Sequence, residues 1–339
     1  MSALGTKLVT LADVAKSKNK QIGKVAEVLV QENPMLEDIP YMEMNMGTYH
    51  VEEIRSGLPT VYYRKANQAI PASKTTTEER TFQAAHVESK SQMDEKVANR
   101  GGSDRIAYNR WNQAQGHLQA HAQEQASLMI YGSPDDSHLK TAGFFDIYSA
   151  LSGSEAANQI IDGGGTTSDM CSILLAFWGE RSMFGIYPAG SMAGIKRTDR
   201  SAGGKLVQIS GLDSDGNAGT FWGYEEQFEF DHGLVVKDYR QAARIANIDP
   251  VTLRSGAGAA DLIDLMISAY YKIHNPSNGK GVWYVNRTVE AFLHKQALTK
   301  VGAGGGLSFE NFEGKRILSF LGFPIKRSDA LLSSEDQVT

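Results

Sequence analysis

Two histidines and a glutamate have the spacing of a metal site on a helix. His121 follows His117 by four residues, and Glu124 follows His121 by three more. Side chains at these spacings lie on one face of a helix, and imidazole and carboxylate groups are common zinc ligands. However, the glutamate does not take the position that it has in an HExxH motif, and nothing in the sequence indicates a fourth ligand. We therefore expect ordinary polar helix residues here rather than a metal site.

Three other segments have part of the composition of a ligand-binding loop. Residues 213–217 read Asp-Ser-Asp-Gly-Asn, like the start of a calcium loop, but Ala218 stands where that loop needs glycine and Tyr224 where it needs glutamate. The glycine clusters at 163–165 and 302–306 match neither a dinucleotide-binding fingerprint nor a P-loop. The first segment is better explained as a hairpin turn, and the glycine clusters as flexible connections.

No residue pattern indicates a catalytic nucleophile. His138 is close to Asp135 and Asp136 in the sequence, but a catalytic triad is a spatial arrangement that neighbours in sequence do not make. Cys171, the single cysteine, adjoins a strongly apolar run, so we expect a packed thiol rather than a nucleophile. We therefore expect no catalytic site, no cofactor and no metal, although an enzyme with a site assembled from dispersed residues stays an open alternative.

The histidines belong to the longest helix signal in the sequence, which covers residues 103–131. We expect Ser103 or Asp104 to cap its start and Gly132 followed by Pro134 to end it. Six residues at spacings of three, four and seven form one stripe. They are Ala107, Trp111, Ala114, Leu118, Ala122 and Met129.

The segment from residue 48 to residue 90 has a different character. It is rich in Thr, Tyr and Val, yet it alternates weakly and holds too few apolar side chains to cover its own faces. Ser56–Pro59 predicts a turn, and Pro71–Ser73 predicts a second bend. Pairing of the first and last parts of this segment would give a long hairpin. A two-stranded ribbon is marginally stable in water by itself, so this hairpin needs a partner surface.

The remaining sequence predicts a mixed α+β body. Short helical pieces are expected within residues 8–31, a hairpin around Asp215–Gly216, and a helical piece after the apolar run 234–236. Apolar residues at helical spacing predict a helix over 260–273, and a strand is expected at 171–178.

Composition and charge set further bounds. The 339 residues predict two compact units, or one unit with large excursions, at about 150 residues per domain. The content of 41% hydrophobic and 22% charged residues excludes a fully disordered chain. The apolar runs are too short to span a membrane, and the N-terminal segment lacks the apolar region of a signal peptide. A net charge of −5 gives no global positive field, so any contact with DNA should be local and weak.

Five blocks of sequence, taken in order, carry a family resemblance. They are TLADVAK at 10–16, SGLPTVYYRKANQAIPASKTTTEE at 56–79, SILLAFWGERSMFGIYPAGS at 172–191, GLVVKDYRQAARIANID at 233–249 and ILSFLGFPIKRSDALL at 317–332. With them the chain resembles the major capsid proteins of tailed bacteriophages with the HK97-type fold, in particular a branch found among short-tailed phages.

The resemblance implies an α+β, HK97-like capsid fold with an N-terminal arm, an extended β-hairpin loop, a peripheral domain with a spine helix, and an axial domain. The implied boundaries are 1–44 for the arm, 45–90 for the extended loop, 91–140 and 201–254 for the peripheral domain with its spine helix at 103–131, 141–200 and 255–332 for the axial domain, and 333–339 for a C-terminal tail. The implied function is that of a major capsid protein, which self-assembles through hexamers and pentamers into the icosahedral head that encloses the phage double-stranded DNA.

Charge suggests how neighbouring subunits attract each other. The ribbon is basic in places, whereas residues 225–231 offer four carboxylates. We expect the ribbon of one subunit to contact the acidic segment of the next, with each exposed pair contributing only about 0–1 kcal/mol. The residues expected at this subunit interface are Arg55, Leu58, Pro59, Tyr63, Arg64, Lys65, Asn67, Lys74, Arg80, Glu225, Glu226, Glu229 and Asp231.

The resemblance also implies partners and a location. The partners are other copies of the chain in the hexamers and pentamers of a shell, a portal protein, scaffolding and cement or decoration proteins, and packaged DNA through weak non-specific contact, with no membrane. The location is the virion capsid, preceded by the host cytoplasm during assembly. Another virion structural protein, of the tail or baseplate, stays open as an alternative.

Overall fold

The computed structural model divides the chain into two compact units. It describes residues 33–100, 102–137, 139–191, 193–201, 204–212, 215–255, 260–300, 307–312 and 315–339. Within these residues, unit 1 contains His86–Ser127 and Gly194–Asp231, and unit 2 contains Pro34–Ala85, Leu128–Ala193 and His232–Thr339. The helical pieces expected within 8–31, His138, and the glycine cluster at 302–306 lie outside the described residues.

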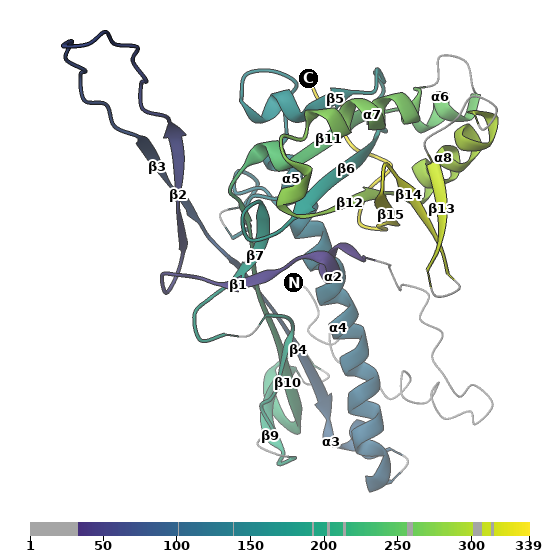
Figure 1. The fold of residues 1–339 in the computed structure, drawn as a ribbon. Helices are drawn as coiled ribbons and strands as arrows, with labels where there is room; N and C mark the ends of the chain where they lie inside the picture. The colour runs from purple at the N-terminus through teal and green to yellow at the C-terminus, as the bar shows by residue number, and fades with distance from the viewer. Residues whose placement is uncertain are drawn as a thin grey trace. The chain divides into compact units, whose positions relative to one another are not determined.

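A seven-stranded mixed sheet forms the centre of unit 2 (Figure 1). Its strand order is β13 (Leu307–Phe312), β14 (Lys315–Phe320), β15 (Phe323–Arg327), β12 (Lys280–Val285), β6 (Cys171–Trp178), β11 (Ala242–Ile248) and β5 (Ile160–Asp162). The predicted strand at 171–178 is thus confirmed as β6, which pairs antiparallel with both β11 and β12. All of its residues are buried, as expected for a strand covered on both faces.

Two helices cover one face of this sheet. α7 (Leu262–Lys272) confirms the helix predicted at 260–273, and the Asp261 carboxylate caps it by accepting from the backbone N–H of Asp264. Ile263 and Met266 of α7 pack in one apolar cluster with residues of β6, β11 and α8 (Arg287–Lys300). The shorter helical elements of unit 2 are α2 (Met35–Asp38), α5 (Phe144–Ile147), η3 (Ala156–Gln159), η4 (Tyr239–Gln241), α6 (Pro250–Ser255) and η5 (Pro276–Asn278).

The helical piece expected after the apolar run 234–236 is wrong. Only a single 3-10 turn, η4, follows that run, and residues 242–248 then form strand β11. β11 pairs with β6 on one side and with β5 on the other, and all seven of its residues are buried. A short apolar run cannot be assigned to a buried strand or a buried helix from its periodicity alone, and the two flanking strands decide the outcome.

Helix α2, near the start of the described chain, is anchored to the large sheet through one carboxylate. Asp38 is buried at the end of α2, where it accepts hydrogen bonds from Lys280, Lys326 and the Tyr284 hydroxyl at 2.7–2.9 Å. Burial alone would raise the pKa of Asp38, but the bonds from the two lysines and the tyrosine lower it overall. Asp38 therefore stays charged and connects α2 to β12 and β15.

The last residues are also part of the fold of unit 2. Glu335 is buried, forms an isolated antiparallel bridge with Met170, and accepts from Arg244 at 3.1 Å. The Asn247 side chain bonds both the N–H and the C=O of Val338. Residues 333–339, expected as a tail, thus contribute buried polar contacts to the large sheet.

Strand β10 (Ala218–Val236) is the main strand of a second sheet. In unit 1 it pairs with β4 (Ala85–Asp94), β8 (Lys196–Asp199) and β9 (Val207–Leu212). Ala218 lies opposite Leu212, so the hairpin predicted around Asp215–Gly216 is confirmed. In unit 2 the end of β10 pairs with β7 (Met183–Tyr187), which also pairs with β1 (Tyr41–Glu43).

Helix α4 (Ile106–Tyr131) confirms the long helix and is preceded by a 3-10 turn, η2 (Ser103–Arg105), and by α3 (Glu95–Ala98). Its buried face differs from the predicted stripe, because Ala107 and Trp111 are exposed whereas His121 and Gln125 are buried. The Arg197 guanidinium lies over the Trp111 ring at 5.4 Å. Ala114 and Met129 of the predicted stripe are buried, so the stripe is confirmed in part, but it counted only apolar residues and missed the buried polar ones. No helix in the described part of the chain is long and apolar enough to cross a membrane.

Candidate subunit interface

The predicted hairpin is present in unit 2, and we call residues 50–82 the limb. β2 (His50–Gly57) and β3 (Thr76–Phe82) pair antiparallel and form a sheet of two strands only. Residues 58–75 connect them as an open loop, which Figure 1 draws between the head of the β2 arrow and the start of β3. Every residue from 58 to 74 is exposed. The limb therefore has no core of its own.

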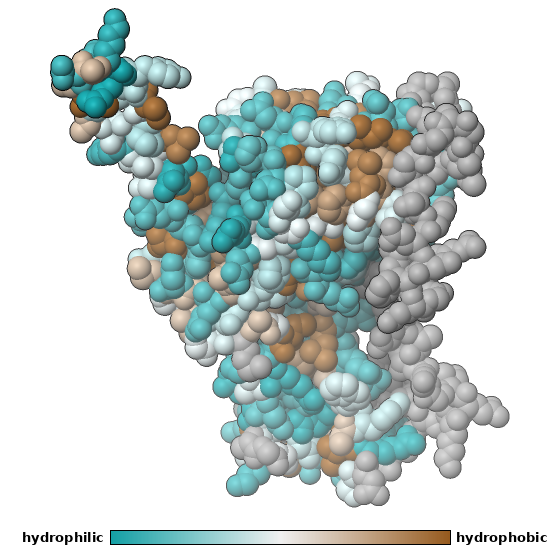
Figure 2. All heavy atoms as spheres, in the orientation of Figure 1, coloured by the Kyte–Doolittle hydropathy of each residue, from teal (hydrophilic) through white to brown (hydrophobic). Residues whose placement is uncertain are grey.

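The loop of the limb exposes large apolar side chains. Leu58 is 79% exposed, Val61 is 87% exposed, and Tyr63 and Ile70 are also exposed. In Figure 2 brown apolar patches lie among teal hydrophilic atoms along the limb. Exposed apolar side chains gathered on one projecting segment are typical of a surface that another protein covers.

The loop turns at a different place from the one predicted. Ser56 and Gly57 continue strand β2, and the tight turn lies at Ala66–Asn67, where the Gln68 N–H donates to the Lys65 carbonyl at 3.2 Å. Asn67 has a φ of 66°, a left-handed conformation that asparagine tolerates better than most residues. The turn expected at Ser56–Pro59 is wrong because the pairing of Gly57 with Thr76 keeps the chain extended there.

The root of the limb is held by a group of contacts that sequence analysis missed. Glu52 Oε1 lies 2.9 Å from His50 Nε2 and accepts from Lys237 Nζ at 2.8 Å. The His50 ring meets the Phe184 ring edge to face, and the Lys237 ammonium lies 5.2 Å from the centre of the same ring. Burial would raise the pKa of Glu52, but the bonds from Lys237 and His50 lower it overall. Lys237 and Phe184 lie far from the limb in the sequence, so no local pattern could reveal their part in these contacts.

The paired strands of the limb carry acidic residues. Glu53 lies directly opposite Glu79, and Glu52 lies opposite Arg80. Arg80, expected at the interface, is half-exposed and its guanidinium lies 3.7 Å from Glu78 of its own strand. The paired strands of the limb are therefore acidic, and the loop that they carry is basic, as predicted.

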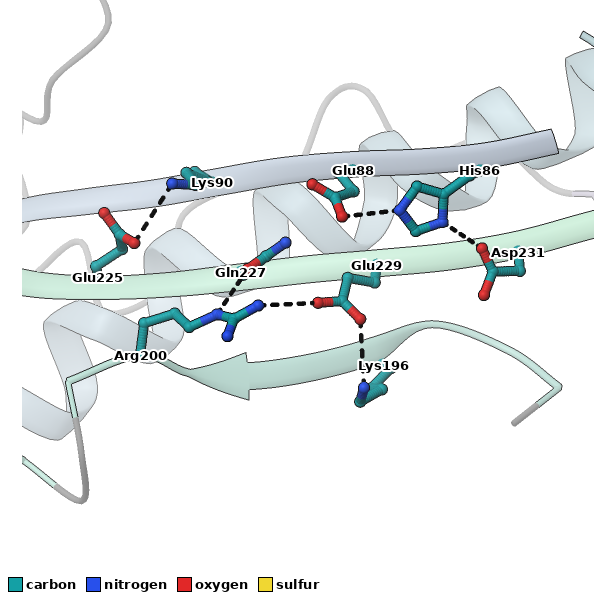
Figure 3. Close-up of polar contacts among 9 residues, drawn as sticks. All are labelled: His86, Glu88, Lys90, Lys196, Arg200, Glu225, Gln227, Glu229 and Asp231. Carbon is teal, nitrogen blue, oxygen red and sulfur yellow. Dashed lines mark hydrogen bonds and ion pairs between the residues drawn. The ribbon is translucent and has the colours of Figure 1, made fainter. Parts of the chain in front are cut away.

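Three of the predicted interface carboxylates lie on one face of β10, between β4 and β8 (Figure 3). Glu225 pairs with Lys90 at 3.5 Å and accepts from Gln92 at 2.7 Å. Glu229 pairs with Lys196 at 3.3 Å and with Arg200 at 3.4 Å. These carboxylates already have cationic or amide partners within unit 1.

Asp231, the third carboxylate on this face, is bonded to His86, whose other ring nitrogen lies 2.8 Å from Glu88 (Figure 3). The hydrogen bond to Asp231, and to a smaller extent the one to Glu88, raises the pKa of His86. His86 therefore gains a proton more readily than a free histidine and links the two acids. None of these contacts was predicted from the sequence.

The fourth carboxylate, Glu226, points to the opposite face of β10. It is 3% exposed and binds Arg197 through both oxygens, at 2.8 and 2.9 Å, and Arg110 of α4 at 2.6 Å. Successive side chains alternate between the faces of a strand, so Glu226 cannot share the exposed face of Glu225. The predicted attraction between a neighbour's loop and these four carboxylates stays a prediction, and Glu226 has no exposed charge to contribute to it.

The two histidines singled out for a metal site share a serine instead. His117 Nδ1 lies 3.0 Å and His121 Nε2 lies 2.8 Å from the Ser89 hydroxyl of β4, and the His117 ring stacks on Phe228 of β10. Burial lowers the pKa of both histidines. The third residue of the pattern, Glu124, is exposed. Among the described residues, no three His, Cys, Asp or Glu side chains are placed so that they could hold one metal ion.

The other candidate residues have structural surroundings. Cys171 is buried, as predicted for a packed thiol, and burial raises its pKa. The N–H groups of Gly163 and Gly165 donate to the carbonyls of Ala246 and Asn247. They are therefore occupied by β11 and form no phosphate cradle.

Comparisons with known proteins identify the class to which this fold belongs. Among solved structures, the chain is similar to a structure of bacteriophage Epsilon15, with 33% sequence identity over 100% of both chains and a TM-score of 0.74. It is also similar to the capsid of bacteriophage JBD30, with 10% identity over 95% of this chain and 99% of that chain and a TM-score of 0.47. No curated protein matches the chain. The α+β fold with its limb and long helix is the HK97-like fold of phage capsid proteins.

The family comparison makes the assignment specific. Residues 17–339 match the family described as major capsid protein GP7, and the chain belongs to this family. It is a major capsid protein of a bacteriophage, and its place is the capsid of the virion. The capsid interpretation is thus confirmed over the alternative of a tail or baseplate component.

Proposed function

We propose that copies of this chain associate through their limbs into hexamers and pentamers, and that these build the icosahedral head around double-stranded DNA. The observation that carries the proposal is the limb itself, which exposes Leu58, Val61 and Tyr63 and has only two strands to support them. Head-to-tail contacts that close produce rings. A limb laid on the next subunit is such a contact.

The proposed contact residues on the limb are those whose side chains are free to meet a neighbour. Leu58, Pro59 and Tyr63 would supply buried area, and the basic residues would supply orientation. Asn67 would hold the turn that shapes the tip. The complete set on the limb is Arg55, Leu58, Pro59, Tyr63, Arg64, Lys65, Asn67, Lys74 and Arg80.

The remaining partners follow from this role. We infer that a portal protein, scaffolding proteins and cement or decoration proteins contact the assembled shell, and that assembly takes place in the host cytoplasm. The net charge of −5 supports only weak, non-specific contact with the packaged DNA. The proposed role asks for no catalysis, no cofactor and no membrane.

Shortening the loop tests the proposal directly. A variant in which residues 58–75 are replaced by Asn-Gly should keep β2 and β3 paired, because this dipeptide favours a two-residue hairpin turn. We expect it to remain folded by circular dichroism and to form neither rings nor shells in gel filtration and negative-stain microscopy, whereas the unaltered chain forms them. Shells formed by the shortened variant would contradict the proposal. An unaltered chain that stays monomeric at every concentration would also contradict the proposal.

A further inference from the structure

The limb carries two unneutralised charge groups of opposite sign. We propose that the outward face of its strands, centred on Glu53 and Glu79, is the docking surface for the basic loop of a second copy of this chain. The inference rests on the proposed function and deepens it, because it names the acceptor surface for the limb. That acceptor is the neighbouring limb.

The acidic group is defined by strand register. Glu53 and Glu79 lie directly opposite each other in the antiparallel pair, and both are exposed. Like charges at directly opposed positions destabilise a sheet. Neither carboxylate has a cation within 4.0 Å among the described residues, and Arg55, the next residue on the same face, forms no ion pair with them. This face of the limb therefore gains from an external cation.

The basic group is equally unpaired. Between residues 54 and 77 the sequence contains no aspartate or glutamate, but it contains Arg55, Arg64, Lys65 and Lys74. Within the described part of the chain, none of these four side chains forms an ion pair with a carboxylate, and Arg64 reaches only the Gln68 carbonyl at 3.3 Å. The loop is thus a positive segment with exposed apolar side chains between its charges.

The length of the limb separates Glu53 from the basic residues near the tip of the loop, Arg64 and Lys65, whereas Arg55 lies on the acidic face itself. Eleven residues lie from Glu53 to Arg64, which at about 3.3 Å per residue allows up to about 36 Å in an extended chain. The loop of one limb can therefore neutralise the acids of another limb without competing with its own. An acidic surface that meets a basic one favours a single orientation of association and disfavours the reverse one.

The carboxylates of β10 provide the contrast. Glu225, Glu229 and Asp231 each contact a basic side chain of unit 1, and Glu226 is buried between two arginines. A basic loop arriving at β10 would have to displace these partners. At Glu53 and Glu79 it displaces only water, which is why charge complementarity favours the limb.

A pair of charge-reversal variants tests the docking surface. One variant carries Glu53→Lys and Glu79→Lys, so that both of its groups are basic, and the other carries Arg64→Glu and Lys65→Glu, so that acidic charge also lies on its loop. Each variant alone should require at least a tenfold higher concentration than the unaltered chain to form rings in sedimentation velocity. An equimolar mixture should recover ring formation, because alternating copies then offer a basic surface to every acidic one. Alternation closes only in rings with an even number of copies, so hexamers should return and pentamers should not.

A matched control and the opposing outcomes make the test decisive. Glu180→Lys also reverses an exposed carboxylate of unit 2 without an ion-pair partner among the described residues, and it should assemble at the concentration of the unaltered chain. Folding of all variants is checked by circular dichroism. If the folded variants assemble alone like the unaltered chain, or if their mixture fails to recover rings, the docking surface is wrong while the proposed function stands. If the unaltered chain itself forms no rings, the proposed function fails and the inference fails with it.

Discussion

The carboxylates of β10 differ from one residue to the next in how far water reaches them. Glu226 has a side chain that is 4% exposed and is held by Arg110 and Arg197, whereas the side chain of Glu229 is 18% exposed and pairs with the more exposed Lys196 and Arg200. A buried charge is costly when it loses its partner, and an exposed one is not. Acidic residues that lie close together in the sequence thus contribute differently to the stability of the fold.

Replacing these two acids separately should measure the difference. Glu226→Gln leaves Arg110 and Arg197 without their shared carboxylate, and we expect it to lower the free energy of unfolding by about 3 kcal/mol. Glu229→Gln, the matched control, should cost about 1 kcal/mol or less. Urea denaturation of the unassembled chain measures both. Equal effects would show that the burial of Glu226 carries no special weight.

His86 should make unit 1 sensitive to pH. Its pKa is raised above the ordinary 6.5 in the folded chain by bonds to Asp231 and Glu88, so its stabilising contribution is complete below pH 6.5 and is lost as the pH rises through the folded pKa. We expect His86→Gln to lower stability at pH 5.5, by less than about 1 kcal/mol because the ring is exposed, and to have a smaller effect at pH 8.5. His117 and His121 have lowered pKa values and opposite pH dependence. The difference in stability between the unaltered chain and the His86→Gln variant therefore isolates His86. A difference that grows with pH would contradict the assignment.

At the scale of elements, the limb depends on its root as well as on a neighbour. A two-stranded sheet is marginal in water, and the root supplies Glu52 as the acceptor for both His50 and Lys237. The root therefore sets how rigidly β2 and β3 are held before any partner binds.

Glu52→Gln should loosen the limb without unfolding the body. The change removes the charge that His50 and Lys237 face, so backbone amides of β2 and β3 should exchange hydrogen severalfold faster in the unassembled chain. Amides of β6 and α7 should keep their protection. Glu53→Gln, an identical change one residue away on the exposed face, is the control and should not speed exchange, because it only relieves the repulsion between Glu53 and Glu79. Equal exchange in both variants would mean that Glu52 does not hold the root.

The elements also show which parts of the fold a sequence can predict. α7 was predicted because Ile263 and Met266 recur at helical spacing, and the β9–β10 hairpin because Asp215–Gly216 is a strong turn signal. β11 was missed because its seven residues become a strand only through β5 and β6. The turn at Ala66–Asn67 was missed because Ser56–Pro59 carries the stronger turn signal. That signal does not include the pairing of β2 with β3, which keeps Gly57 extended.

For the candidate site, residue types were predictable and partners were not. The sequence indicated a basic, exposed loop, and Arg64, Lys65 and Lys74 are exposed in the structure. It could not indicate that Glu226 faces inward or that Asp231 meets His86, since His86 lies 145 residues away along the chain. Long-range pairing decides which charges remain free.

At the scale of the whole molecule, length predicted either two compact units or one unit with large excursions, and the described chain divides into two units. Neither unit is a continuous stretch of sequence, because the chain passes back and forth between them. The implied peripheral and axial domains are also discontinuous, but their boundaries at 91, 141, 201 and 255 stay predictions. Composition limits the number of units, and only the three-dimensional contacts decide where each one begins.

The charge distribution of the limb has a consequence for the speed of association. Acidic strands and a basic loop give the limb an electric dipole along its length, so two limbs that approach attract in one relative orientation and repel in the other. Such steering raises the rate of productive encounters at low ionic strength and fades as the Debye length shrinks. The same protein should then build its shell at a pace that the salt of its surroundings sets, even where the finished shell is equally stable.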